Sequence, residues 1–174
     1  MRRCGSGRVP RDRVRECRPT ARKEHGLGEE AKRSGEVLSL HLSRVEDGER
    51  VSNSEIYVDR SGVLGDKFYG KEDNRSILIT AIDSYRMAQK EGIEIPYGSL
   101  GENIVVDYNP YHLMPGTRFW IGDVELEITQ NCTLCKSLTR VDSRLPKLLR
   151  NDRGVFAKAL RAGMIRTGDV LRLK

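Results

Sequence analysis

The chain has 174 residues, 37% hydrophobic and 32% charged, a composition typical of one globular domain with its own hydrophobic core. No apolar run approaches the roughly 20 residues of a membrane-spanning helix, which argues against an integral membrane protein. The net charge is +6, but residues 1–34 hold 11 Lys/Arg against 5 Asp/Glu, so the rest of the chain is balanced. The charge therefore gives no reason to expect nucleic-acid binding outside that first segment.

Residues 1–34 are rich in Arg, Gly and Pro and contain few aliphatic residues. Such a segment buries too little apolar surface to offset the entropy that it would lose on folding. We expect a basic, disordered leader at 1–34 and one folded domain at 35–174. An RNA-binding arm and an organellar presequence are alternatives for the leader. Because no apolar secretory segment follows Met1 and cysteines are few, we expect a reducing, cytoplasmic compartment.

The folded part predicts many short strands. Short or alternating apolar runs bounded by turn residues predict strands at 37–42, 54–59, 75–80, 104–107, 117–121, 124–129 and 170–173. Glycine-bearing loops are predicted at 62–70 and 96–103, and Gly122-Asp123 predicts a hairpin turn.

Helices are predicted at three places. The first covers about 81–91, where Thr80 and Asp83 resemble a loose capping box and Gly92 ends the apolar pattern. Two shorter helical pieces are predicted at about 144–150 and 153–162. Because strands outnumber helices, the pattern favours a mainly β fold, a barrel or a folded-over sheet, over a doubly wound α/β fold.

The Cys132-Thr-Leu-Cys135 motif, which follows a predicted strand, is the clearest chemical feature. A thiolate is a nucleophile, a carrier of persulfide sulfur and a ligand for soft metals, and Lys136 beside Cys135 favours the thiolate. Structural zinc and a thioredoxin-like dithiol are alternatives, although neither a second ligand pair nor a βαβ unit accompanies the motif. Two buried structural cysteines are a further alternative.

Five motifs occur in order along the chain. They are GVLGDKFYG (62–70), RSILIT (75–80), GSLGENIVV (98–106), IGDVELEITQNCTLCKSL (121–138) and GVFAKALRAGMIRTGDVL (154–171). Together they resemble a stand-alone MOSC domain, the module named for the C-terminal part of molybdenum cofactor sulfurases, over about residues 35–174. The resemblance implies a mainly β fold, a MOSC-type β-barrel of strongly bent strands with a few short helices. It also implies one pocket cysteine that carries sulfur or ligates the metal of the molybdenum cofactor (molybdopterin).

The resemblance extends to individual positions. Cys135, followed by Leu138, matches the family's cysteine, which leaves Cys132 as the accessory one. Gly65-Asp66 matches a GD pair, but no histidine follows it where the family often has one, and Gly101-Glu102-Asn103 matches a GEN turn that either lines the pocket or only shapes the loop. The phosphate of a pyranopterin calls for basic residues. The candidate cofactor-binding residues are Cys135, Gly65, Asp66, Lys67, Arg75, Glu102, Asn103, Lys136 and Arg140.

The resemblance predicts a domain that binds molybdenum cofactor through Cys135, as sulfur donor or as molybdenum ligand. An enzyme of this kind would transfer sulfur to the cofactor or reduce N-hydroxylated substrates. Sulfur transfer requires a partner, a pyridoxal-phosphate cysteine desulfurase or a molybdoenzyme. Reduction requires an external electron donor, because the sequence shows no flavin, haem or iron–sulfur signature. The alternatives are a non-catalytic carrier of sulfur or cofactor and an RNA-associated protein acting through residues 1–34.

Overall fold

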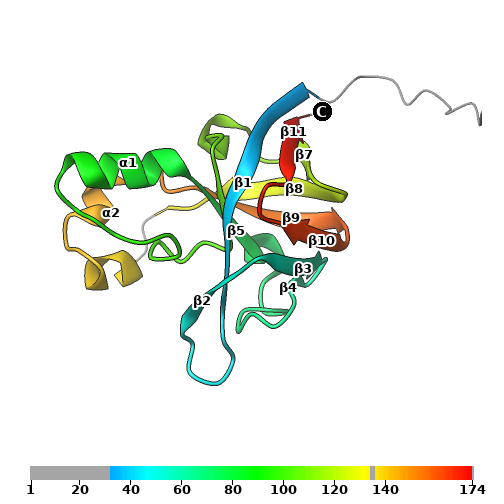
Figure 1. The fold of residues 1–174 in the computed structure, drawn as a ribbon, viewed down its shortest axis with the longest axis horizontal. Helices are drawn as coiled ribbons and strands as arrows, with labels where there is room; N and C mark the ends of the chain where they lie inside the picture. The colour runs from blue at the N-terminus through cyan, green and yellow to red at the C-terminus, as the bar shows by residue number, and fades with distance from the viewer. Residues whose placement is uncertain (1–31, 134–135, 174) are drawn as a thin grey trace, which may run out of the picture.

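A closed ring of seven strands forms the centre of the computed structural model, which describes residues 32–133 and 136–173 (Figure 1). The ring runs β1–β11–β7–β8–β9–β5–β6 and returns to β1, with β2 (Arg50–Asn53) added outside it. Neighbours in the ring are antiparallel except β5 and β6, which are parallel. The bounds are β1 Lys32–Ser43, β5 Ile77–Ala81, β6 Ile104–Val106, β7 Arg118–Ile121, β8 Val124–Asn131, β9 Val155–Arg161 and β11 Val170–Leu173.

β1 closes the ring because it pairs with three neighbours along its length. It pairs with β11 at its start, with β6 in its middle and with β2 at its end. Its register shifts between Arg33 and Gly35 and again between Val37 and Ser39. Such bulges bend a strand and change which side chains face inward. As a result Val37 and Leu40 both lie in the core, which interrupts the simple alternation expected over 37–42.

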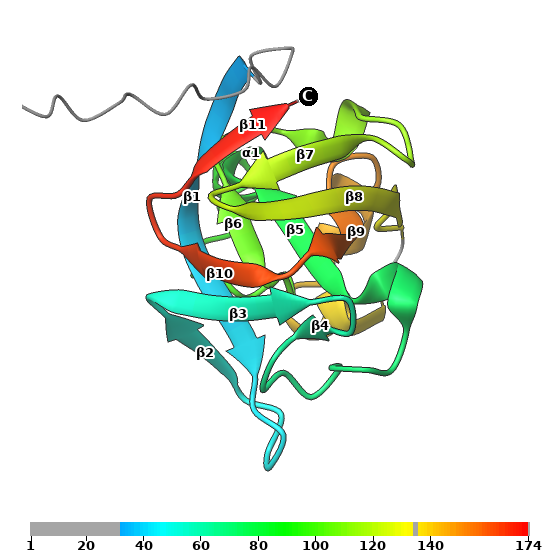
Figure 2. The same cartoon turned by 90° about the vertical axis from the view of Figure 1, so that its right-hand side faces the viewer.

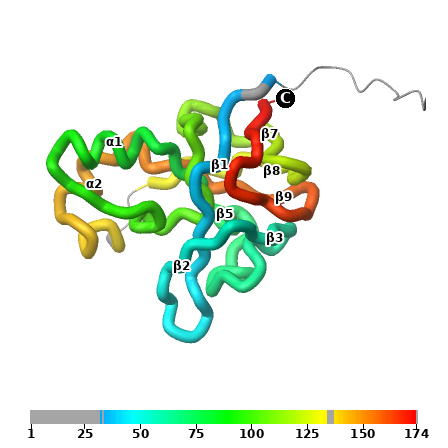
Figure 3. The backbone as a smooth tube through the Cα atoms, in the orientation of Figure 1, coloured from blue at the N-terminus to red at the C-terminus, as the bar shows by residue number. Residues whose placement is uncertain are grey.

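Two hydrophobic clusters hold the molecule together. The larger fills the barrel and consists mainly of branched aliphatic side chains from its strands, with Phe119. The smaller lies where α1 (Ile82–Lys90) and α2 (Leu145–Leu148) pack on one side of the barrel, as Figure 3 shows. The tight, isoleucine- and valine-rich interior identifies the barrel as a packed core.

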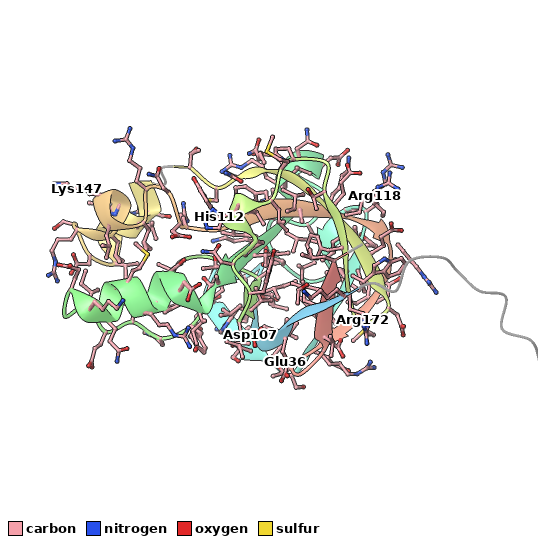
Figure 4. All side chains as sticks on the ribbon, turned by 90° about the horizontal axis from the view of Figure 1, so that it is seen from above. Glu36, Asp107, His112, Arg118, Lys147 and Arg172 are labelled. Atoms are coloured by element: carbon pink, nitrogen blue, oxygen red, sulfur yellow. The ribbon has the colours of Figure 1, made fainter. Side chains whose placement is uncertain are left out.

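Three short strands form a second sheet beside the barrel, in the order β10–β3–β4 (Figure 2). Three 3-10 turns, η1, η2 and η3, lie in the connections. Figure 4, which draws all side chains, places Lys147 on the helical side, with Arg118 and Arg172 at the opposite side of the barrel. The bounds are β3 Glu55–Asp59, β4 Gly62–Val63, β10 Gly163–Arg166, η1 Asp73–Arg75, η2 Pro110–His112 and η3 Lys136–Arg140.

The mainly β fold and the helix predicted at about 81–91 are confirmed. The capping box is wrong, because Thr80 belongs to β5 and its hydroxyl donates to the Arg153 carbonyl oxygen at 3.0 Å. The helix predicted at 153–162 is also wrong, since β9 occupies this segment and pairs with β8 and β5. No helix in the described residues is long and apolar enough to span a membrane.

Candidate functional site

A pocket of about 570 Å³ opens beside the barrel, within the range usual for small-molecule and cofactor sites. Buried side chains form its floor and exposed side chains form its rim. The floor includes Ser76, Leu78, Asn103, Cys132, Arg153 and Phe156. The rim includes Phe68, Lys71, Glu72, Arg75, Ser137 and Val141.

Arg153 is the most unusual residue of the floor. It is only 4% exposed, and its Nη2 and Nη1 donate to the carbonyl oxygens of Leu100 (2.9 Å) and Thr133 (3.4 Å). Its Nε has no hydrogen-bond partner, and no carboxylate pairs with it within the residues that the structure describes. A buried guanidinium without an acidic partner is costly, so the site favours an anionic ligand.

Arg50 supplies a second guanidinium beside the first. Its Nη2 donates to the Gly101 carbonyl oxygen, and its Nη1 lies 3.6 Å from Asp66 Oδ2, too far for a hydrogen bond. A Cβ built on Gly101 would lie 3.7 Å from Arg50 Nη2 and 3.9 Å from Arg153 Nη2, so both guanidiniums lie close to Gly101. Burial lowers the pKa of Arg50, while Asp66 raises it. The two arginines thus create positive charge that Asp66 alone does not balance.

Asp66 and Asn103 hold the loops that shape the pocket. Asp66 Oδ2 accepts from Ser43 N (2.8 Å) and Asn103 Nδ2 (3.1 Å), and its Oδ1 accepts from Phe68 N at 2.9 Å. Asn103 Oδ1 accepts from Leu78 N at 3.1 Å. The side-chain amide of Asn103 therefore links β5, which contains Leu78, to the loop that contains Asp66. The GD and GEN motifs therefore act first as loop supports, although Asn103 also lines the pocket.

Glu102 lies fully buried behind the pocket. Its Oε1 accepts from Tyr85 Oη and from Gly98 N (2.7 Å), whereas Oε2 has no hydrogen-bond partner. Burial raises the pKa of the Glu102 carboxyl, opposed by those hydrogen bonds and more weakly by Arg50. Burial therefore favours the neutral acid over the carboxylate at this position.

Replacing Glu102 by glutamine is expected to change how stability depends on pH. Because the folded-state pKa of Glu102 is raised above the ordinary value of 4.5, its favourable contribution is complete below that value and declines as pH rises toward the folded-state pKa. Glu102→Gln should therefore become more stable relative to the parent between pH 4.5 and neutral pH. Urea unfolding at several pH values measures the difference, and a difference that stays constant with pH would contradict the expectation.

The structure brings together only some of the predicted site residues. Lys67, Arg75 and Asn103 line the pocket, whereas Arg140 is exposed at the end of η3. The other predicted residues do not line the pocket or are not described in full. Gly65 forms an exposed turn, and Asp66 and Glu102 are buried but do not line the pocket. Lys136 is the first residue of η3, and its side chain is not among the described ones. Cys135 lies outside the described residues.

Arg50 and Arg153 were missed by the sequence reasoning. Neither stands in a motif, although Arg153 directly precedes the GVFAKAL segment. Because the chain contains 31 Lys/Arg, the one sequence feature that could have marked Arg153 is its position next to that motif. In residues 32–133 and 136–173, no three His, Cys, Asp or Glu side chains gather as metal ligands, so a zinc site would need residues beyond these.

Solved structures share this fold at low sequence identity. The YuaD protein from Bacillus subtilis (APC1665) is 18% identical with a TM-score of 0.69, covering 82% of this chain and 97% of that one. YiiM from Geobacillus stearothermophilus is 16% identical with a TM-score of 0.61, covering 80% and 75%. YiiM from Escherichia coli is 17% identical with a TM-score of 0.60, covering 80% and 69%.

A search of curated protein sequences gave no significant match. The family model of the MOSC domain matches residues 65–172, which include the pocket residues Lys67, Arg75, Asn103 and Arg153. Members of this family are linked to proteins of molybdenum cofactor chemistry. Since the match covers more than half of the chain, and the strands close into the barrel described above, this chain belongs to the MOSC domain family.

Proposed function

We propose that the pocket binds molybdenum cofactor, with Arg50 and Arg153 on its phosphate and Cys135 as sulfur carrier or molybdenum ligand. The observation that carries the proposal is the pair of guanidiniums close to Gly101, of which Arg153 is buried and Arg50 is partly buried. Each also has a buried nitrogen without a hydrogen-bond partner, Arg50 Nη1 and Arg153 Nε. A phosphate would offer several acceptor oxygens and a negative charge, which Arg153 lacks and which Arg50 receives from Asp66 alone at 3.6 Å.

Different observations bear on the roles of Cys132 and Cys135. Cys132 lies in the floor of the pocket, packed with Leu78 and Phe156. Cys135 lies outside the described residues, but the flanking Cys132 and Ser137 both line the pocket. The family's pattern, in which Cys135 followed by Leu138 matches the pocket cysteine, supports Cys135 as the residue that acts on the cofactor.

The residues of this chain would bind the cofactor and fix its orientation in the pocket. Arg50 and Arg153 would neutralise the phosphate, and Leu78 and Phe156 would keep water from the floor, which strengthens those charge contacts. The cofactor, when bound, supplies the metal-centred redox or sulfur-accepting chemistry. We therefore propose either the reduction of N-hydroxylated compounds with an external electron donor, or sulfur transfer with a cysteine desulfurase or molybdoenzyme as partner.

Metal and pterin content tests the proposal. The full chain is purified without oxygen from a host that makes molybdenum cofactor, beside Cys135→Ala and the matched variant Cys132→Ala. We expect near-stoichiometric molybdenum and pterin in the parent, retained in Cys132→Ala. If Cys135 is the metal ligand, Cys135→Ala loses molybdenum. If Cys135 only carries sulfur, Cys135→Ala keeps molybdenum but loses sulfur loading. Zinc, or no metal and no pterin, in the parent would refute cofactor binding.

A further inference from the structure

The rim of the pocket differs in chemistry from its floor. We propose that the substrate of this site is an amphipathic anion, a flat body lying against the Arg75 side chain with a carboxylate held by Lys67 and Lys71. This inference rests on the proposed function, because it names the substrate class of the same pocket. Its support comes from how the rim cations are held and which of them already have partners.

One aromatic ring organises the two lysines. The Nζ atoms of Lys67 and Lys71 lie 5.1 and 5.7 Å from the centroid of the Phe68 ring, within the range of cation–π attraction. The β1–β2 connection also confines Lys67, since a Cβ on Gly48 would lie 2.9 Å from its Nζ. Neither lysine pairs with a carboxylate in the described part of the chain. Two pre-positioned and unpaired ammonium groups at a pocket mouth form a clamp for an anion.

The wall beside this clamp is formed by Arg75, whose side chain is half exposed at the rim. Its guanidinium carbon lies 4.7 Å from the centroid of the Phe156 ring, and Phe156 itself is only 8% exposed, so Arg75 is the group that a ligand meets. Glu72 Oε2 lies 3.7 Å from Arg75 Nη1 and offsets part of its charge. A guanidinium packed on an aromatic ring favours a planar group on its other face, and the carboxylate is left to the two lysines.

The two sets of cations differ in depth, which separates their ligands. Arg153 is buried in the floor, while Lys71 is exposed at the rim. A phosphate on the floor would neutralise the arginines but would not contact the lysines at the rim. The lysine clamp is then the part of the pocket that selects among substrates.

Turnover of a matched substrate pair tests the inference. The cofactor-loaded full chain is given 4-carboxy-N-hydroxybenzamidine or its neutral 4-carbamoyl analogue, with reduced methyl viologen as electron donor. Reduction breaks the N–O bond with two electrons, one from each of two reduced viologens, and two protons from solvent, releasing water and the amidine. We expect the carboxylate to have a kcat/KM about tenfold higher, mainly through KM, since two exposed ion contacts contribute modestly.

Lysine variants assign that preference to the rim. In Lys67→Gln/Lys71→Gln the two substrates should become nearly equal while molybdenum and pterin content stays at the parent level. The matched control is Lys90→Gln/Lys147→Gln, on α1 and α2, which should keep the preference. Equal turnover of both substrates by the parent, a preference that survives in the lysine variant, or loss of cofactor from that variant would each overturn the inference.

Binding without turnover separates this inference from the proposed function. Calorimetric titration of the parent with 2-naphthoate and 2-naphthamide should show tighter binding of the acid, abolished in Lys67→Gln/Lys71→Gln but kept in Arg153→Gln. Phe156→Leu should weaken both ligands about equally. A preference removed by Arg153→Gln alone would place the anion on the floor and overturn the inference. If the chain binds no cofactor, turnover fails, yet these titrations still report on the clamp.

Discussion

Replacing Arg153 by methionine is expected to weaken binding of molybdenum cofactor by roughly 10- to 100-fold, because a hydrogen bond to a charged group contributes about 1.5–3 kcal/mol. Methionine keeps much of the side-chain volume but removes the charge and the donors. The phosphate would then face Arg50 alone, in a site whose remaining buried carboxyl groups are Asp66 and Glu102. Molybdenum and pterin content after anaerobic purification measures the effect.

Two further variants separate charge from shape and from folding. Arg153→Lys keeps the positive charge but not the planar fork, so its cofactor content should lie between the parent and Arg153→Met. Arg161→Met removes an exposed arginine at the other end of β9, which stacks 5.8 Å from the Trp120 ring centroid, and should retain cofactor. Parent-like cofactor content in a well-folded Arg153→Met protein would show that the phosphate lies elsewhere.

Replacing Gly154 by alanine is expected to destabilise the fold by about 4 kcal/mol, combining backbone strain with steric overlap. Gly154 has φ +132°, a conformation that side chains rarely allow. A Cβ there would overlap the Ile79 carbonyl oxygen and lie 2.8 Å from Thr80 Oγ1. Because β5 is central to the sheet, neither contact can relax cheaply. Urea unfolding followed by circular dichroism measures the loss.

Gly92 provides the matched control for that prediction. Its φ is +71°, and a Cβ there would meet no atom within 4 Å, so Gly92→Ala carries only the conformational cost of about 1–2 kcal/mol. The difference between the two variants measures the close approach of Gly154 to β5 together with the added strain of its φ of +132°. If Gly154→Ala unfolds at the same urea concentration as Gly92→Ala, the packing around Gly154 is loose enough to accept a methyl group.

Local patterns in the sequence predicted most of the strands and the helix α1. The failure lies at 153–162, where Ala, Lys, Leu and Arg favour a helix by intrinsic propensity. Here β9 pairs with β8 and β5, and β10 pairs with β3, so long-range partners decide the conformation. No local window contains those partners. β2 was missed for the same reason, since only its pairing with β1 defines it.

The candidate site was predictable only where a motif marks it. Lys67, Arg75 and Asn103 stand within or next to motif loops, and all three line the pocket. Arg50 and Arg153 come from distant parts of the chain and converge only through the fold. Sequence spacing carries no information on such convergence, so the proposed anion site cannot be found from the sequence alone.

The pairing of β1 with β11 has a consequence for how the chain acquires its structure. Partners such as Glu36 and Val170 are separated by most of the folded part, so the ring closes through contacts of high sequence separation. Contacts of this kind slow folding, because the chain loses conformational entropy in bringing distant segments together before the strand pairs can stabilise it. During synthesis on the ribosome, β1 and β7 would present open edges until residues 170–173 emerge. Such edges can pair with other chains, so closure of the ring by β11 removes a route to aggregation.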